Sequence, residues 1–142
     1  MLNELPVGEF LAALGERTPT PASGAATALT GALAAGLTEL AARFAGDEDA
    51  VVRAKAAVTR LVELADEDTE AYEAFMADRS EANRARIIAV PEEIAARADE
   101  VAELAERVHA QLRTSVAGDA EAAAELARAA ARVARRLAEL NI

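Results

Sequence analysis

The sequence predicts an all-α protein, an antiparallel helical bundle of about five to six helices that forms one domain over residues 1–142. Apolar residues recur at helical spacing over long stretches, and no segment alternates apolar and polar residues as a half-buried strand does. The expected connections are short, which favours antiparallel neighbours. The chain length also suits a single domain with one core.

The first half of the chain predicts two helices separated by prolines. A short helix is expected over residues 6–15, with Pro6 near its first turn. Gly15 and the segment Thr18–Pro21 then interrupt the pattern, because proline disfavours helix in the residue before it. A second helix is expected from Ser23 or Gly24 to about Phe44. Its large residues form one helical stripe, flanked by small residues: Leu29, Leu33, Leu37, Leu40 and Phe44.

The second half predicts three or four more helices. Gly46 and Asp47 start a long helix that is expected to end near Asp78. A short helix over Glu81–Ile88 and another that begins at Pro91 are expected next, and a last helix that starts at Gly118 and Asp119. The stripe of the Pro91 helix is Ile94, Val101, Leu104, Val108 and Leu112; that of the last helix is Leu126, Val133, Leu137 and Leu140.

The composition is dominated by small side chains. Forty residues are alanine and only four are aromatic, so a core made from them has little apolar area per residue. Such a chain gains stability by close helix packing or by oligomerisation. The second helix has small residues on more than one side, so we expect it to be enclosed at or near a two-fold interface of a homodimer.

Charge and residue types exclude several classes of function. A net charge of −10 argues against nucleic-acid binding, which needs clustered basic residues. The chain has no cysteine and one histidine, His109, so no metal site is expected. Residues 18–38 are the longest low-charge stretch, and we interpret them as an interior helix with no membrane contact. The first ten residues have no basic start and no long apolar run, so we expect a cytoplasmic protein.

Asp68 is the most informative polar residue of the chain. It lies in the segment LADEDTEAYEAFM, on the apolar side of the third helix, with Leu64 and Leu61 before it and Tyr72 and Phe75 after it at helical spacing. A carboxyl group among such side chains loses water, which raises its pKa and lets it exchange protons near neutral pH. The alternative is a structural aspartate that is hydrogen-bonded to the Tyr72 hydroxyl or to another helix.

Asp119 is a second candidate and also has two interpretations. It follows Gly118 at the expected start of the last helix, where a carboxylate usually serves as an N-cap for free backbone N–H groups. The basic stripe of Arg128, Arg132, Arg135 and Arg136 on that helix is typical of a solvated face, or of a face that meets an acidic partner.

Three segments, in order, resemble the cyclodeaminase and methenyltetrahydrofolate cyclohydrolase family of folate enzymes. The first is VGEFLAALGERTPTPASGAATALTGALAAGL, similar to a family opening with a proline, a glycine-rich run and a small-residue helix. The second is LADEDTEAYEAFM. The third is VPEEIAARADEVAELAERV, with SVAGDAEAAAELARAA and a closing LNI.

The resemblance implies a helical, usually dimeric enzyme that binds folate between helices or subunits. It implies that Asp68 is the proton donor and acceptor, and that folate contacts Pro21, Ser23, Gly24, Tyr72 and Asp119. The substrate is a tetrahydrofolate derivative, and no cofactor or metal is implied. The reaction is either hydrolysis of methenyltetrahydrofolate or cyclodeamination of formimidoyltetrahydrofolate.

The chain also departs from the family pattern. Pro21 is followed by Ala22, Ser23, Gly24 and Ala25 where the family usually has three glycines and a serine. The family's lysine after the aromatic segment is absent, with Arg79, Arg84 or Arg86 as possible substitutes, and the chain stops at Ile142, before the further long helix that family members usually have. These departures suggest an alternative, a non-catalytic binding or assembly module that retains the fold.

Overall fold

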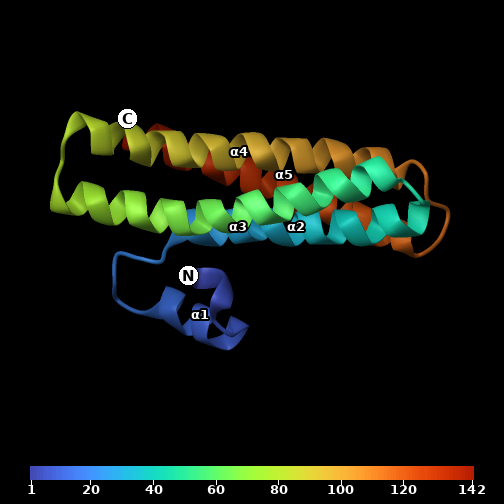
Figure 1. Cartoon of the computed structure of the whole chain (residues 1–142), viewed down its shortest axis with the longest axis horizontal. Helices are drawn as coiled ribbons and strands as arrows, with labels where there is room; N and C mark the ends of the chain where they lie inside the picture. The colour runs from blue at the N-terminus through green and yellow to red at the C-terminus, as the bar shows by residue number, and fades with distance from the viewer.

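A computed structural model describes all residues 1–142 and confirms the all-α class. Its elements are a 3₁₀ turn η1 (Leu2–Glu4) and five helices: α1 (Val7–Gly15), α2 (Ser23–Ala45), α3 (Glu48–Ala77), α4 (Glu81–His109) and α5 (Val116–Asn141). The four long helices α2 to α5 form an antiparallel bundle, and α1 lies apart from it (Figure 1).

The core combines large side chains from two helices with small ones from the other two. The largest fully buried side chains include Leu61 and Leu64 of α3 and Ile94, Val101 and Val108 of α4. Every buried residue of α5 is an alanine, and the buried residues of α2 are alanine, glycine and threonine. Alanine lets helix axes approach closely, so α2 packs against α3, α4 and α5 at once.

The leucine stripes of α2 and α5 lie on the outer side of the bundle, so one chain covers α2 on its small-residue side, and enclosure by a second copy stays a prediction. Leu33 and Phe44 of α2 are each 67% exposed, and Leu140 of α5 is 62% exposed. The small residues beside each stripe face the core instead. The small inner side chains let α2 approach its neighbours closely, while α3 and α4 supply the large buried side chains that fill the core.

Helix α4 runs without interruption through Pro91. The prediction of two separate helices in this part of the chain is therefore wrong. Proline removes the backbone N–H that would bond to the carbonyl of Ile87. That carbonyl accepts a hydrogen bond of 2.8 Å from the side-chain amide of Asn141, near the end of α5. Pro91 is itself buried, and the replacement partner satisfies the polar group that the proline leaves free.

Helix α5 begins at Val116, two residues before the predicted start, so Asp119 lies in the first turn and is not the N-cap. In α2 the N-cap is Ala22 and the helix starts at Ser23, whereas the sequence predicts Ser23 or Gly24 as the cap. Helix α2 is long and apolar enough to cross a membrane by length and composition alone, but 56% of its most apolar window is buried in the bundle.

The N-terminal segment touches the bundle lightly. Helix α1 has no buried residue, and Val7 and Leu11 are 74% and 59% exposed. The η1 turn contacts α3, where the Leu2 amide donates a hydrogen bond of 2.9 Å to Asp66. The apolar face of α1 is therefore uncovered within one chain.

Candidate functional site

The first turn of α2 packs directly on the carboxyl group of Asp68. A Cβ built on Gly24 would overlap all three atoms of this carboxyl group. Glycine is therefore the only residue type that fits at position 24, because it has a hydrogen atom where every other residue has a Cβ. The sequence predicts a role for Gly24 in backbone approach to a ligand, whereas the structure places it against Asp68.

Asp68 is half-buried and has no partner in the chain. Neither of its oxygens forms a hydrogen bond or an ion pair with another residue, and the Tyr72 hydroxyl also forms no hydrogen bond. The interpretation of Asp68 as a structural residue bonded to Tyr72 is thus excluded. Burial raises the pKa of Asp68 to about 6, since the charged form loses water without gaining a donor.

The start of α2 supplies unused hydrogen-bond donors beside this acid. Its N-cap, Ala22, makes no side-chain cap bond, and the first α2 backbone bond runs from Ala26 to Ala22. The preceding linker is held against α3 by Thr20, whose hydroxyl donates a hydrogen bond of 2.8 Å to Glu73. This places Pro21 and Ser23 close to the α3 face that carries Asp68.

The last part of α3 extends beyond the start of α2. Helices α2 and α3 are antiparallel, and Gly24 in the first turn of α2 contacts Asp68. Residues 69–77 of α3 therefore extend beyond the N-terminal end of α2. In this part Tyr72 is 36% exposed and Met76 is 48% exposed. Asp68 therefore lies opposite the N-terminus of α2. The partly exposed side chains of Tyr72 and Met76 follow it on α3 toward the α3–α4 turn.

The structure does not bring Asp119 to the same place. Ala120, its neighbour, packs with Ala41 and Ala50 at the opposite end of the bundle from Gly24 and Asp68. Pro21, Ser23, Gly24 and Tyr72 lie at the Asp68 end. Within one chain, Asp119 cannot share a ligand with Asp68.

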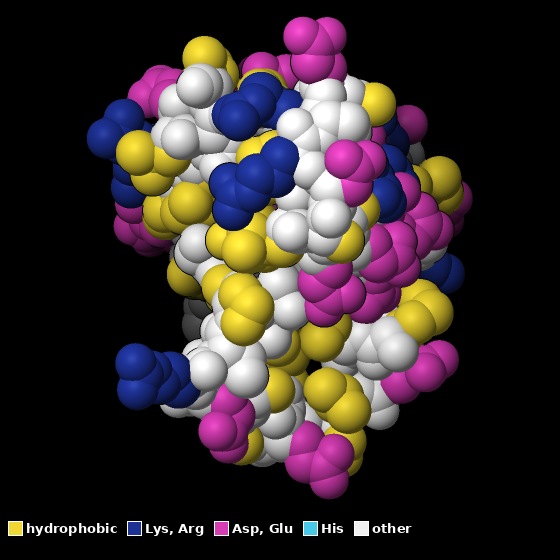
Figure 2. Space-filling view, turned by 90° about the vertical axis from the view of Figure 1, so that its left-hand side faces the viewer, with side chains coloured by type: hydrophobic (Ala, Val, Ile, Leu, Met, Phe, Trp, Pro, Cys, Tyr) yellow, Lys and Arg dark blue, Asp and Glu magenta, His cyan; other side chains and the backbone are white.

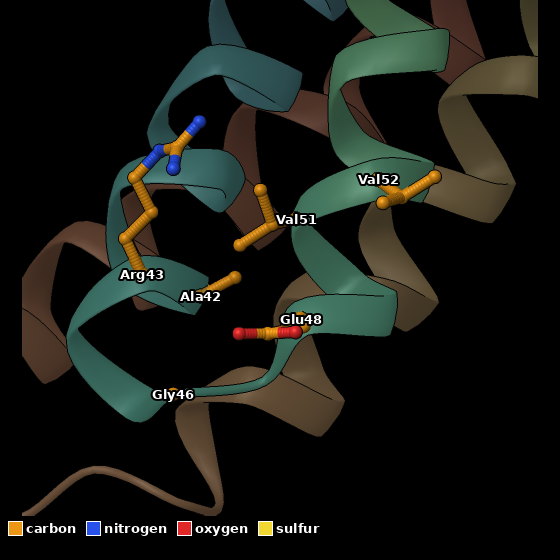
Figure 3. A pocket seen from close by; sticks show the side chains of 6 residues that line it. All are labelled: Ala42, Arg43, Gly46, Glu48, Val51 and Val52. Atoms are coloured by element: carbon orange, nitrogen blue, oxygen red, sulfur yellow. The ribbon is translucent and has the colours of Figure 1, made fainter.

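Two surface hollows are prominent and neither contains Asp68. One, of about 360 Å³, lies at the α2–α3 turn, where Val51 and Glu48 of α3 face Ala42 of α2 and the Arg43 guanidinium points away (Figure 3). The other, of about 280 Å³, lies between η1 and α3 and includes Asp66. Asp68 thus lines neither of these two hollows.

Sequence reasoning missed the surroundings of Phe75, seven residues after Asp68. The ring is buried, and the guanidinium carbons of Arg79 and Arg84 each lie 5.1 Å from its centroid. The aromatic at this position was visible in the sequence, but the meeting of Arg84 from α4 with α3 required the fold. No group of three or more His, Cys, Asp or Glu side chains in the chain is arranged to hold a metal ion.

The fold and the surroundings of Asp68 together indicate a general class of protein. The molecule is a small helical bundle in which an unpaired carboxyl group with a pKa near neutrality lies beside a free helix N-terminus. An unpaired acid with a raised pKa in such a place marks a candidate functional site.

Comparison with known proteins identifies the family. Residues 6–142 match the family model described as formiminotransferase-cyclodeaminase, so the chain belongs to this family and is a folate-related cyclodeaminase domain. The structure is similar to that of formiminotetrahydrofolate cyclodeaminase from Thermotoga maritima, with a TM-score of 0.93 and 26% sequence identity. The similarity covers 99% of this chain and 80% of the other. No curated protein matches the sequence.

Proposed function

We propose that the protein is an enzyme of folate one-carbon metabolism that acts on a C–N bond, with Asp68 as the proton shuttle. The observation that carries the proposal is the unpaired, half-buried carboxyl group of Asp68 packed against Gly24. A pKa of about 6 lets this group both accept and donate a proton near neutral pH. The family match and the Thermotoga maritima cyclodeaminase support a folate substrate.

In the cyclohydrolase version, water attacks the methenyl carbon that bridges two folate nitrogens. Asp68 takes a proton from the attacking water as the C–O bond forms. The proton passes to the nitrogen that leaves when the C–N bond breaks, and a formyl group remains on the other nitrogen. One further proton is released to solvent, which balances the loss of the substrate's positive charge.

In the cyclodeaminase version, a folate nitrogen attacks the protonated formimino carbon. Asp68 takes the proton of the attacking nitrogen and gives it to the amino group, which leaves as ammonia. The product is the methenyl bridge, with the positive charge retained. Both reactions require one group that accepts a proton and then donates it. A pKa of about 6 suits this general acid–base role near neutral pH.

The folate contacts follow from position around Asp68. The unused N–H groups at the start of α2, next to Ser23 and Gly24, would hydrogen-bond polar atoms of the pterin ring. Pro21 and the half-exposed ring of Tyr72 would pack on its faces. Asp119 would reach this ligand only from a second subunit, because it lies at the far end of its own bundle.

The direct test follows methenyltetrahydrofolate absorbance with purified wild type, Asp68→Asn and Asp66→Asn. Asp66 is a matched control on the same helix, two residues away and bonded to Leu2. We expect Asp68→Asn to lower kcat by about 10²- to 10⁴-fold, the usual effect of losing a general acid–base. Asp66→Asn should retain activity. Ammonia release from formimidoyltetrahydrofolate distinguishes the two reactions, and wild-type rates equal to the spontaneous ones on both substrates would refute the proposal.

We also propose that the protein is a homodimer in which a second copy covers the outer stripe of α2. Leu33, Leu40 and Phe44 form an apolar strip along α2 at 67%, 41% and 67% exposure. The face of α1 is uncovered as well. Exposed apolar faces that run along a helix mark protein interfaces.

Light scattering of wild type, Leu33→Glu and Leu140→Glu tests the dimer. Leu33 and the control Leu140 are exposed at 67% and 62%, so neither charge should disturb the fold of one chain. We expect wild type and Leu140→Glu to be dimers and Leu33→Glu to be a monomer. A monomeric wild type at micromolar concentration would contradict the proposal.

The alternative function is a non-catalytic helical binding or assembly module that keeps the family fold. Alanine at positions 22 and 25 and the lack of a prominent hollow at Asp68 favour it. Thermal shift with tetrahydrofolate derivatives separates the two, since a ligand that binds only the native state raises Tm. A rise in Tm without turnover would favour a binding module, and no rise with any folate would favour an assembly module.

A further inference from the structure

The arginines of this chain fall into two groups. Nine of the fourteen form an ion pair with a carboxylate, as expected in a chain whose net charge is −10. The other five have no carboxylate partner even though acidic side chains are abundant. They are Arg17, Arg79, Arg84, Arg113 and Arg132.

Two of these five share one aromatic ring. Arg79 and Arg84 each place their guanidinium carbon 5.1 Å from the centroid of the Phe75 ring. Arg79 otherwise donates only to the Met76 sulfur, at 3.6 Å, and Arg84 only to the backbone oxygen of Asn141, at 3.3 Å. Two like charges held on one ring repel each other, and a bound anion would remove that repulsion.

The pair lies at the same end of the bundle as Asp68. Phe75 follows Asp68 by seven residues, so the two lie on one face of α3, about 10 Å apart along its axis. Helix α2 does not cover this part of α3, because it begins opposite Asp68. Figure 2 shows this end of the molecule, where basic side chains gather on the bundle above the N-terminal segment.

We propose that Arg79 and Arg84 bind the glutamate carboxylates of the folate, an inference that rests on the proposed function. A folate has its reacting carbon and its carboxylates at opposite ends of a rigid p-aminobenzoyl group, whose length suits the spacing from Asp68 to Phe75. Phe75 holds both guanidinium groups in place before the ligand arrives. Guanidinium groups suit this role because their planar fork matches a carboxylate.

The experiment compares methenyltetrahydrofolate with the corresponding methenyltetrahydropteroamide, which lacks the glutamate and ends in a neutral amide. In the double variant Arg79→Gln, Arg84→Gln we expect KM for the folate to rise about 10- to 100-fold, the effect of losing charge-assisted hydrogen bonds. Its kcat and its KM for the pteroamide should stay within about threefold of wild type, since that substrate has no carboxylate for the pair to bind. The double variant Arg113→Gln, Arg132→Gln is the matched control and should behave as wild type.

Two outcomes would overturn the inference. In one, the Arg79, Arg84 variant has an unchanged KM for the folate. In the other, its KM rises equally for the two substrates, which would mean that the arginines act on the fold and not on the glutamate. Circular dichroism of each variant checks that the fold is retained.

A binding measurement separates this inference from the proposed function. If wild type turns over neither folate, the proposed function fails, and calorimetry with N-(4-aminobenzoyl)glutamate still tests the arginine pair. We expect wild type and Asp68→Asn to bind this probe, and the Arg79, Arg84 variant to bind it about tenfold or more weakly. p-Aminobenzamide, the same ring without glutamate or any carboxylate, should bind to all three proteins equally weakly. Equal binding of the glutamate probe to all three would overturn the inference.

Discussion

Asp47 and Asp68 lie at opposite ends of the bundle, and their carboxyl groups differ in the hydrogen bonds that they accept. Asp47, the N-cap of α3, accepts hydrogen bonds from the Ala50 amide at 3.1 Å and from Gln111 and Arg107 at 2.8 Å each. Asp68 accepts none and packs against Gly24. A carboxyl group with three donors contributes to the fold, whereas one with no donor is left free for chemistry.

The pKa values move in opposite directions for the same reason. The Gln111 hydrogen bond, followed by that of the Ala50 amide, lowers the pKa of Asp47, because these donors favour the charged form. Burial alone raises the pKa of Asp68 to about 6. The comparison indicates that hydrogen-bond partners, more than burial, decide whether an acid in this bundle is structural, and five experiments test it.

The largest effect is expected from Gly24→Ala. The new methyl group would overlap the Asp68 carboxyl group, so either α2 or the acid must move. We expect a loss of about 2–3 kcal/mol in the free energy of unfolding, as for other overpacked sites, and a drop in activity of tenfold or more. Urea unfolding and the methenyltetrahydrofolate assay measure the two effects. Unchanged stability and activity together would show that the contact between Gly24 and Asp68 has no consequence.

Removing each acid should change stability with opposite sign. We expect Asp68→Asn to raise the free energy of unfolding at pH 7 by about 1–2 kcal/mol, after allowance for the solvent that a half-buried group still meets. We expect Asp47→Ala to lower it by about 1–2 kcal/mol, because a helix cap and two further hydrogen bonds are lost. Denaturant midpoints of the two variants beside wild type provide the measurement. Destabilisation by both changes would mean that Asp68 has a structural partner.

The pH dependence of stability should separate the two acids again. The folded-state pKa of Asp68 lies above its unfolded value of 3.8, so the folded state holds the extra proton and stability falls as pH rises from about 4 to 6. The folded-state pKa of Asp47 lies below 3.8, so its contribution is present above about pH 4 and is lost as pH falls. Unfolding curves from pH 3 to 7 should lack the first change in Asp68→Asn and the second in Asp47→Ala.

The same titration should appear in the kinetics. The pH profile of kcat/KM should show an apparent pKa near 6 if Asp68 transfers the proton. A profile that stays flat between pH 5 and 7 in wild type would assign the proton transfer to another group.

The smallest effect is expected from Gly36→Ala, the glycine control for Gly24. Gly36 is an exposed glycine inside α2, and a Cβ there meets nothing within 4 Å. Alanine should therefore raise the free energy of unfolding by about 0.5–1 kcal/mol through helix propensity alone. Thermal unfolding beside Gly24→Ala measures the contrast, and a destabilised Gly36→Ala would point to close packing of a second copy on this face.

The sequence by itself determined the helical class, the bounds of most helices to within a few residues and the placement of Asp68 on an apolar side of α3. These properties are local, because helix propensity, prolines and the spacing of apolar residues act within one segment. The residues of the family resemblance, confirmed by the family match over residues 6–142, also come from the sequence alone.

Only the tertiary structure decided which side of α2 faces the core, that α4 continues through Pro91, and which groups meet Asp68. Periodicity finds a stripe, but whether the leucine side or the alanine side of a helix turns inward depends on which side chains its neighbours bring to the core. The Asn141 amide that satisfies Ile87, the fit of Gly24 to Asp68 and the distance to Asp119 all join residues far apart in the chain. Such contacts depend on how helices approach in space, which no local pattern records.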